Sequence, residues 1–508
     1  MQIKGIRSKR RTIPNPKIKW WQLKGEKRET FKRKLLLEEG VWESQESANI
    51  MWKNMAKKVE IVAKEILGES KGFGPRDKET WWWNEDVQEK VRNKKNCFKA
   101  IHLCNSAENW EKYRLARKEA KKVVSEARAK AYEGFYKELG TKAGEQKIYK
   151  IAKNKERESK DLDQVRCIKN EIGNVLVTDG DIKNRWEEYF YKLFNDGSES
   201  STCELEDFTV SECEVNRLFY RRIRVLEVRE ALKRMENGQS VGPDGIPIEV
   251  WKCLGEEGVI WLTKLFNEIL RSKKMPDDWR KSTLVPIYKN KGDIQNCANY
   301  RGIKLMSHTM KLWEKVIEHR LRVETSISER QFGFMPGRST TEAIYLLRGI
   351  MEKYRCRRRD LHMVFIDLEK AYDRVPRDVL WKALKKKGVC VAYIQAIQDM
   401  YDGVLTKVRT PGGETKDFPI RIGLHQGSSL SPYLFNLVVD VLTESIKEDV
   451  PMCMLFADDI VLLGESREEI NAKLEIWRNT LESKGFRLSR SKTEYMYCNF
   501  QVDNLEVI

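Results

Sequence analysis

The chain has 508 residues, of which 95 are Lys or Arg and 77 are Asp or Glu, so its formal net charge is +18. An apolar fraction of 41% is enough to build a core, which excludes disorder throughout, and no window approaches the roughly 18 uninterrupted apolar residues that a membrane-spanning helix needs. The excess positive charge is typical of proteins that bind polyanions, and nucleic acid fits this chain better than a membrane surface.

The 11 cysteines are scattered, without a C-x-x-C pair or a nearby His at zinc-finger spacing. We therefore expect reduced thiols in an intracellular protein. The N-terminal segment is basic and has no apolar stretch, so it is not a secretory signal. Its RSKRR run reads as a solvated basic arm, with a nuclear-import patch as the alternative. Between the two intracellular compartments, the nucleus is favoured over the cytoplasm.

Residues 1 to about 205 are rich in lysine and helical in pattern, and tryptophan clusters interrupt them at 20–21 and 81–83. The segment 107–140 is dense in helix formers and i,i+4 charge pairs, which predicts a long helix that Gly140 stops. The aromatic residues are expected to anchor helices to one another, with stacking on nucleic-acid bases as the alternative. Residues 195–204 are small and polar, which predicts a linker.

From about residue 206 onward, helix and strand patterns are mixed, which favours an α+β arrangement over alternating βαβ units. The elements expected here are a helix over 227–238 that ends at Gly238, buried strands over 282–288 and 363–368, and an amphipathic helix over 431–448. At the start of the last helix, Ser431 is suited to cap it and Pro432 to its first position.

Two adjacent aspartates, Asp458 and Asp459, interrupt the apolar stretch FADDIVLL at 456–463. This pattern predicts a tight hairpin with both carboxylates near its tip. Burying two like charges requires compensation, and a hard divalent cation such as Mg²⁺ supplies it when the ligands are oxygens. Another apolar strand ends in Asp367, so Asp367 and Asp458 would meet if the two strands are neighbours. Such a site suits phosphoryl transfer with two metal ions, and an exposed acidic turn beside an ordinary strand-end Asp is the alternative.

The segments FIDLEKAYDRVPRDVLWKAL, GLHQGSSLSPYLFNLVVDVL, FADDIVLL and LESKGFRLSRSKTEYM resemble the successive palm motifs of reverse transcriptases, most of all those of non-LTR (LINE-type) retrotransposons. Upstream, SVGPDGIPIEVWK, the WRKSTLVPIYKNKGDIQNCANYRG region and QFGFMPGRSTTEAIYLLR resemble the fingers and early palm of that family. The resemblance runs from about 225 to 498 in the order of the family. It implies a right-hand polymerase fold of fingers and palm, with helices packed on an antiparallel sheet.

The resemblance also implies a domain order. A basic, Trp-rich and mostly helical connector is expected over 1–205, fingers and early palm over 206–360, and the palm with its carboxylates over 361–508. No segment resembles the endonuclease of these elements, and after Lys492 none resembles the primer grip, the thumb or a C-terminal Cys/His knuckle. We therefore expect a fragment of the family's full-length protein.

Residue roles follow from the resemblance. Asp367, Asp458 and Asp459 would be the catalytic carboxylates that hold Mg²⁺, with Mn²⁺ as a second candidate, and Lys492 would protonate the leaving pyrophosphate. The nucleotide-binding residues it implies are Lys289, Lys291 and Arg301 for the triphosphate, Tyr372 against a ribose 2′-hydroxyl, and Gln426 and Gly427 beneath the incoming base. Gly337 and Arg338 would contact the template or primer backbone.

The function that the resemblance implies is RNA-directed DNA synthesis, with an RNA template, a DNA primer or target and deoxynucleoside triphosphates as partners. Two alternatives stay open at this point. One is a nucleic-acid-binding remnant that cannot extend a primer, and the other is a different palm-type nucleotidyl transferase. The sequence alone gives no oligomeric state.

Overall fold

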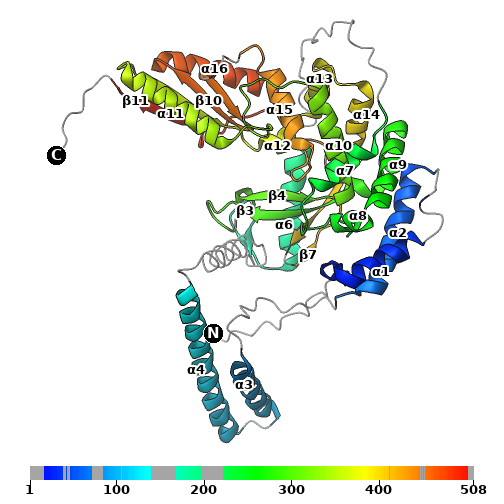
Figure 1. Cartoon of the computed structure of the whole chain (residues 1–508). Coiled ribbons are helices and arrows are strands. Elements are labelled where there is room, and N and C mark those ends of the chain that lie inside the picture. Colours follow the sequence, from blue (N-terminus) through cyan, green and yellow to red (C-terminus); the bar gives the residue numbers. More distant parts are fainter. Residues whose placement is uncertain are drawn as a thin grey trace, which may run out of the picture. The chain divides into compact units, whose positions relative to one another are not determined.

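A computed structural model describes residues 16–37, 42, 46–70, 84–103, 106–138, 167–196, 221–410, 412–446, 448, 450 and 452–500. The chain divides into two compact units, and we describe each by itself (Figure 1). The first unit comprises Met1–Lys17 and Ser70–Gln164, and the second comprises Ile18–Glu69 and Val165–Ile508.

The described part of the first unit is a helical hairpin of α3 (Glu85–Leu103) and α4 (Ala107–Glu138). The long helix predicted from residue 107 is confirmed, whereas Gly140 lies outside the described residues. Small and apolar side chains such as Val87, Ala116 and Ala120 are buried in the hairpin. The tryptophan cluster at 81–83 also falls outside the described residues.

The second unit mixes helices and strands, which confirms the α+β expectation. Its helices are η1 (Trp20–Gln22), α1 (Gly25–Leu36), α2 (Ala48–Leu67), α6 (Asp179–Asn195), α7 (Val225–Lys233), α8 (Ile248–Leu254), α9 (Glu256–Ser272), η5 (Asp277–Arg280), η6 (Cys297–Asn299), α10 (His308–Glu324), α11 (Thr340–Cys356), α12 (Ala371–Arg374), α13 (Arg377–Lys386), α14 (Val391–Tyr401), α15 (Ser431–Leu442) and α16 (Arg467–Glu482). Its strands are β1 (Ile168–Lys169), β2 (Val175–Leu176), β3 (Lys281–Tyr288), β4 (Tyr300–Leu305), β5 (Leu361–Asp367), β6 (Leu405–Thr410), β7 (Gly413–Glu414), β8 (Phe418–Pro419), β9 (Cys453–Phe456), β10 (Asp459–Gly464) and β11 (Glu494–Cys498).

A four-stranded antiparallel sheet, in the order β11-β5-β10-β9, contains both predicted carboxylate strands. Alternate residues of its strands face opposite sides. Met363 and Leu463 share a small core with Ile350 of α11, whereas Ile366 and Leu462 belong to the main core with helix α16. Figure 1 shows α11 and α16 on the two sides of this sheet. Covering both faces leaves the strand ends at Asp367 and Asp459 as the part of the sheet available for a site.

A second sheet carries the predicted strand at 282–288 as part of β3, in the order β4-β3-β6-β7, with β8 also paired to β6. Its β3–β6 pair is parallel, so this sheet is mixed, whereas the four-stranded sheet and the small β1–β2 sheet match the antiparallel expectation. Strand β4 pairs with β3 so that Arg301 lies opposite Ile287. Because the side chains of β4 alternate, Arg301 is exposed and Lys304 is buried.

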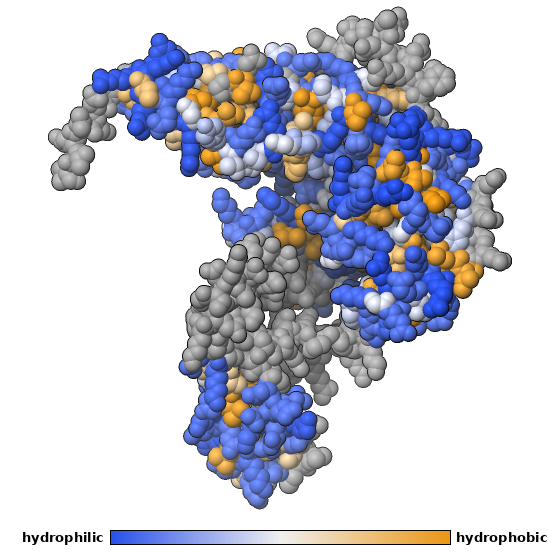
Figure 2. Space-filling view, in the orientation of Figure 1, coloured by the Kyte–Doolittle hydropathy of each residue, from blue (hydrophilic) through white to orange (hydrophobic). Residues whose placement is uncertain are grey.

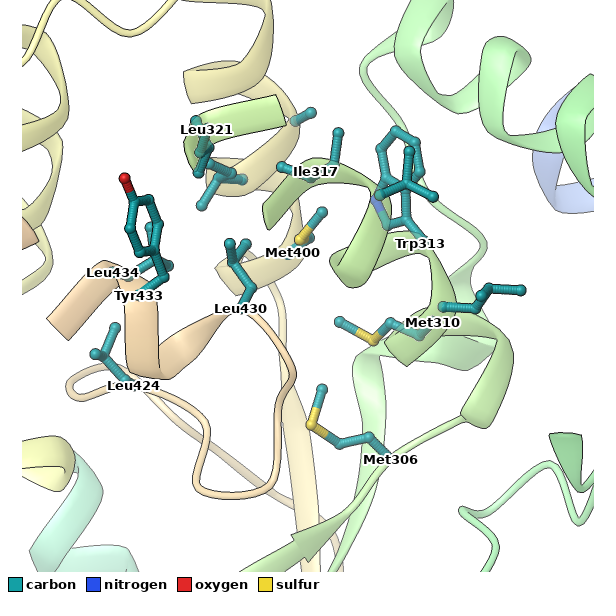
Figure 3. Packing of buried hydrophobic residues seen from close by; sticks show 14 of the residues in the cluster. Met306, Met310, Trp313, Ile317, Leu321, Met400, Leu424, Leu430, Tyr433 and Leu434 are labelled. Carbon is teal, nitrogen blue, oxygen red and sulfur yellow. The ribbon is translucent and has the colours of Figure 1, made fainter. Parts of the chain in front are cut away.

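The main core joins helices α10, α14 and α15 around the loop between Leu424 and Leu430. Figure 3 shows side chains from these helices, including Ile317, Met400 and Tyr433, gathered near Leu430. Both ends of the loop are buried, at 1% exposure each. The polar loop between them is therefore held against the core by its own ends.

Serine caps begin the helices that border the sheet. The hydroxyl of Ser339 accepts a hydrogen bond from the Glu342 amide at the start of α11, at 3.2 Å. The hydroxyl of Ser466 accepts one from the Glu469 amide at the start of α16, at 3.1 Å. In each case an N-cap oxygen satisfies a backbone donor that the first turn leaves unpaired.

Two predicted helix ends and one predicted cap are wrong. Helix α7 ends at Lys233, and Gly238 lies in the following turn at φ 76°. Helix α15 ends at Leu442, not at residue 448, and it is buried on nearly all sides, not amphipathic. Ser431 is already helical and does not cap α15, because its hydroxyl accepts a bond from the His425 amide at 3.2 Å. Pro432 does lie in the first turn.

The domain boundary expected near residue 205, with most of the linker at 195–204, falls outside the described residues, and the three-part division stays a prediction. No helix in the described part of the chain is long and apolar enough to cross a membrane. On the face of the molecule seen in Figure 2, hydrophilic residues predominate and hydrophobic ones form small separate groups.

Candidate active site

The two predicted aspartates lie at a tight turn between β9 and β10. Phe456 and Asp459 are paired, and Ala457 and Asp458 form the two-residue connection. Ala457 has a φ of +56°, whereas Asp458 does not lie in the positive region. A positive φ at the first central residue alone is the signature of a type II′ turn, which matches the twist of a hairpin. The predicted hairpin is therefore present, and Asp458 belongs to its turn.

The neighbouring segment 331–333 holds this turn in place. The carbonyl Oε1 of Gln331 accepts hydrogen bonds from the amides of Ala457 at 3.0 Å and Gly333 at 2.9 Å. A Cβ added to Gly333 would lie 2.5 Å from the Ala457 nitrogen, so only glycine allows this approach. The turn that carries the aspartates is thus fixed by backbone contact with a segment more than a hundred residues away.

The strand register brings the predicted carboxylates together. Asp459 is the direct antiparallel partner of Asp367. Side chains of such a pair leave the sheet on the same face, with Cβ atoms about 5 Å apart. Asp458 is one residue earlier in the turn and is electrostatically coupled to both. The turn thus places two adjacent aspartates at one strand-end pair, although a regular strand would separate them.

The proximity of these charges is expressed in their pKa values. Burial raises the pKa of Asp458, and the charge of Asp367 raises it further, against the opposing effects of Arg301 and Lys492. Burial also raises the pKa of Asp459, as do the charges of Asp458 and Asp367. Each carboxylate therefore gains from any cation that joins the cluster.

Lys492 lies directly on Asp367. Its Nζ donates to Oδ1 at 2.7 Å and to Oδ2 at 3.0 Å. The chain before Lys492 is fastened beside β5, because the Ser489 amide donates to the Asp367 carbonyl at 2.8 Å and the Glu369 amide to the Arg487 carbonyl at 2.8 Å. The predicted lysine therefore reaches the carboxylates from a segment attached to the same strand end.

Two of the three predicted triphosphate-binding residues approach this cluster. The charge of Arg301 lowers the pKa values of Asp458 and Asp459. Burial lowers the pKa of Lys289, and nearby positive charges, Lys492 and Arg301 among them, lower it further. Lys291 is exposed in the loop after β3 and is not among the main charges that shift the pKa values of Asp458 and Asp459.

Tyr372 lies in α12, soon after the strand that ends in Asp367. Its ring stacks on Phe435 of α15, with 4.5 Å between ring centroids and 18° between planes. Its hydroxyl is buried and has no hydrogen-bond partner in the described structure. Burial raises the pKa of Tyr372, and the charge of Asp458 raises it further. The ring therefore lies beside the carboxylates and is held rigidly by a second aromatic.

Gln426 and Gly427 lie in the loop that precedes α15. The Gln426 carbonyl accepts a bond from the Lys304 amide at 2.8 Å, and its side-chain Nε2 donates to Asp373 Oδ2 at 3.1 Å. Gly427 has a φ of +111°, and a Cβ there would lie 2.6 Å from the Lys304 carbonyl oxygen. The loop backbone therefore packs directly on β4, at a position where only glycine fits.

A buried glutamate anchors the other end of this loop. Glu314 of α10 accepts hydrogen bonds from the Ser428 hydroxyl and the Ser429 amide, both at 2.8 Å. Burial raises the pKa of Glu314 to about 7, against the lowering effect of these two bonds. The loop of Gln426 and Gly427 is thus tied to α10 as well as to β4.

Gly337 and Arg338 lie just before α11 and are not linked directly to the carboxylates by the contacts of the described residues. Gly337 has a φ of +77° and open space around it. Arg338 forms an ion pair with Glu342 at 2.6 Å, and its guanidinium lies over the ring of Phe332, 5.0 Å from the centroid. Phe332 lies between Gln331 and Gly333, so Arg338 adjoins the segment that holds the aspartate turn.

The three carboxylates suit a hard divalent cation in their chemistry, since all are oxygen donors, and burial together with neighbouring carboxylates raises the pKa values of Asp458 and Asp459. Their arrangement is not that of a preformed cage. Among the described residues, no three His, Cys, Asp or Glu side chains are placed so that they could hold a metal ion. Lys492 bonds both oxygens of Asp367 in this arrangement, so a metal ion would have to displace its ammonium group.

Sequence reasoning missed four residues that support the site: Gln331, Glu314, Lys304 and Asp373. Gln331 and Glu314 act through partners 126 and 114 residues away, which no local pattern reveals. Lys304 did carry a signal. It follows Tyr300 and Gly302 at the inward-facing positions of β4, where a charged side chain is out of place.

Comparisons with known proteins place these residues in a family context. Residues 287–507 match the family model described as reverse transcriptase (RNA-dependent DNA polymerase). The chain is 30% identical over 264 residues to a protein from Drosophila melanogaster named probable RNA-directed DNA polymerase from transposon BS, covering 48% of this chain and 28% of that protein. It is 28% identical over 274 residues to the Pol polyprotein of the type-1 retrotransposable element R2 of Nasonia vitripennis, covering 52% of this chain and 26% of that protein.

The chain thus spans less than a third of the length of these two relatives. A solved structure of telomerase from Candida tropicalis is also similar, with 13% sequence identity, a TM-score of 0.34 and coverage of 50% of this chain and 53% of that one. At that TM-score the likeness carries no argument about function.

Proposed function

We propose that this chain, whose residues 287–507 form a reverse transcriptase domain related to those of non-LTR retrotransposons, adds deoxynucleotides to a primer 3′-hydroxyl on an RNA template. One observation carries the proposal. Asp459 is paired with Asp367 in the strand register while Asp458 occupies the adjoining turn, so three aspartates lie at one end of the sheet. Arg301 and Lys492 supply the opposing charge there.

In this proposal Asp367, Asp458 and Asp459 hold divalent metal ions, as the reverse transcriptase family does in general. Mg²⁺ is the ion proposed, with Mn²⁺ as a second candidate. When bound, the ions would activate the primer hydroxyl and offset charge on the leaving pyrophosphate. The raised pKa values of Asp458 and Asp459, which burial causes, support this role, because a bound metal ion would stabilise their ionised forms beyond what Arg301 and Lys492 supply.

The basic side chains around the carboxylates would hold the triphosphate. Arg301 suits bidentate contact with phosphate. Lys289, which directly follows the neighbouring strand β3, adds a point charge. Lys291, an exposed residue of the same loop, stays a candidate for triphosphate contact. Lys492, displaced from Asp367 by the substrate and its metal ions, would stay within reach to give a proton to pyrophosphate.

The remaining residues would shape the nucleotide site. The Tyr372 ring, held against Phe435, would clash with a ribose 2′-hydroxyl and so select deoxynucleotides. Gln426 and Gly427 would lie beneath the incoming base, where glycine allows a close backbone approach. Gly337 and Arg338 would contact the template or primer backbone. We propose an intracellular location, with the nucleus favoured over the cytoplasm.

The test is extension of a DNA primer on an RNA template by the full chain with Mg²⁺. Asp458→Asn is expected to lower the rate at least a hundredfold, because it removes a proposed metal ligand at nearly constant size. Asp417→Asn, at an exposed aspartate, is the matched control and should keep the wild-type rate. A rate of primer extension that Asp458→Asn leaves unchanged would contradict the proposal.

A remnant that binds nucleic acid without extending a primer is the second candidate. The ammonium of Lys492 on both oxygens of Asp367 favours it, because it leaves the carboxylates without a preformed metal cage. In the same assay, salt-sensitive binding of primer and template with no incorporation at any Mg²⁺ or Mn²⁺ concentration would support the remnant.

A further inference from the structure

Lys304 is a buried charge that the proposed mechanism does not use. Its side chain is only 1% exposed, and its Nζ has no hydrogen-bond partner in the described part of the chain. The ammonium lies over the ring of Phe194, 4.5 Å from the centroid. Burying a lysine without a hydrogen bond is costly, so another charge must keep it there.

That charge is Asp373 in α12, directly after Tyr372. Asp373 is also buried, and its Oδ1 has no hydrogen-bond partner in the described structure. Burial lowers the pKa of Lys304 to about 7 although the charge of Asp373 opposes this, and burial raises the pKa of Asp373 to about 6 although the charge of Lys304 opposes this. Each residue therefore favours the charged form of the other. The other charged groups that act on the pair are Lys289, Lys370, Arg374 and Arg377.

The second oxygen of Asp373 contacts a residue of the candidate site. Oδ2 accepts a hydrogen bond from Gln426 Nε2 at 3.1 Å. An ionised carboxylate can only accept, so it must meet the amino end of the Gln426 amide. The carbonyl end of that amide, Oε1, consequently points away from Asp373. If Asp373 were neutral it could donate instead, and either end of the amide could then face it.

We propose that Lys304 and Asp373 are positioning residues that fix the orientation of the Gln426 amide, so that its carbonyl oxygen faces the incoming nucleotide. This inference rests on the proposed function and deepens it, because it names two residues that set nucleotide recognition without touching the substrate. Lys304 supplies the countercharge, and Asp373 supplies the contact.

The backbone of Lys304 has a separate role, which makes the side chain testable by itself. Its amide donates to the Gln426 carbonyl at 2.8 Å, and its carbonyl packs on Gly427. These contacts place the loop backbone whatever the side chain at 304. A substitution of the Lys304 side chain should therefore leave the loop backbone in place, so that only the Gln426 side-chain amide is free to reorient.

The experiment measures binding of a deoxynucleoside triphosphate to the full chain with an RNA template and a DNA primer that ends in a dideoxynucleotide. Asp373→Asn is nearly isosteric, but its amide can donate as well as accept. We expect it to weaken nucleotide binding at least fivefold with little change in melting temperature. Asp417→Asn is the control at an exposed aspartate and should bind as the wild type does.

A comparison in a Gln426→Ala background separates positioning from general structure. If Asp373 acts through the Gln426 amide, Asp373→Asn should have no further effect once that amide is removed. An equal loss in both backgrounds would overturn the inference. Lys304→Met should weaken binding as Asp373→Asn does, and should likewise lose its effect in the Gln426→Ala background. If Lys304→Met fails to fold, the Asp373→Asn pair of measurements still decides the question.

The dideoxy primer keeps this result independent of catalysis. Nucleotide binding that weakens in Asp373→Asn while the wild type fails to extend an ordinary primer would support the positioning pair and reject the proposed polymerase. If the wild type extends a primer and Asp373→Asn binds nucleotide as tightly as the wild type does, the proposed polymerase is supported and the positioning pair is rejected. A wild-type chain that neither binds nucleotide nor extends a primer would overturn both.

Discussion

Glu314 shows how one buried carboxylate supports a site that it does not enter. It receives hydrogen bonds from Ser428 and Ser429, at the base of the loop that carries Gln426 and Gly427. Removing this carboxylate would take the acceptor from both donors, and an unpaired buried donor costs about 1–3 kcal/mol. Shape and hydrogen bonding at this position are therefore required, whereas the negative charge is not.

This distinction predicts the pH dependence of stability. The pKa of Glu314 is raised to about 7 in the fold from an ordinary value of 4.5, so the folded chain retains a proton that the unfolded chain has lost. Stability from this group is full below pH 4.5 and is lost as pH rises to about 7, by roughly 3 kcal/mol. Glu314→Gln keeps the size and an acceptor for Ser429 but has no charge to bury. We expect its melting temperature to equal that of the wild type near pH 4.5 and to exceed it at pH 8.

Glu314→Ala is the control, since it removes the acceptor as well as the charge. It should melt below the wild type at every pH. Melting curves of Glu314→Gln and wild type that run parallel from pH 4.5 to 8 would show that Glu314 does not titrate in this range.

At the scale of elements, the β9–β10 hairpin could be predicted from the sequence, because two short apolar runs on either side of Asp458 and Asp459 are typical of two strands joined by a tight turn. The pairing of β10 with β5 was only a hypothesis, since local patterns do not specify which strands become neighbours. The start of α15 was predicted correctly, but its capping residue was not. Ser431 has the chemistry of a cap, but its hydroxyl accepts a hydrogen bond from the His425 amide in the preceding loop.

The close approach of segment 331–333 to the hairpin predicts an effect of one methyl group. In Gly333→Ala the new Cβ would lie 2.5 Å from the backbone nitrogen of Ala457, so the turn that carries Asp458 must shift. Since catalytic groups tolerate little displacement, we expect primer extension to fall at least tenfold. The measurement is the single-turnover rate on an RNA template.

Gly349 provides the matched control in α11. It has helical backbone and nothing within 4 Å of an added Cβ, so Gly349→Ala should stabilise the helix by about 1 kcal/mol and leave the rate unchanged. Equal rates for both alanine variants would show that the turn is insensitive to the Gln331–Gly333 segment.

For the whole molecule, composition and motif order indicated the class of partner and the α+β architecture before any geometry was known. They could not supply Lys304, Asp373 or Gln331, because these residues gain their roles only where β4, α12 and the hairpin meet. Buried polar residues of this kind look like ordinary loop or strand positions in one dimension. The residues proposed to contact substrate therefore belong to motifs that can be recognised in the sequence, whereas the residues that support them do not.

The net charge of +18 predicts how the full chain should hold its substrate. Each phosphate neutralised by Lys or Arg releases a counterion, so the logarithm of affinity should fall linearly with the logarithm of salt concentration, with a slope near −0.9 per contact on duplex. If Arg301, Arg338 and the surrounding lysines make about four such contacts, affinity for an RNA–DNA primer-template should drop roughly a hundredfold between 50 and 200 mM salt. Fluorescence anisotropy at several salt concentrations measures this slope.

Replacing Arg338 with Gln should make the slope shallower by about the share of one phosphate contact, because a phosphate contact adds to the salt dependence without specifying sequence. A slope that Arg338→Gln leaves unchanged would remove the loop before α11 from the nucleic-acid interface, and a slope near zero in the wild type would contradict the polyanion-binding role for the whole chain.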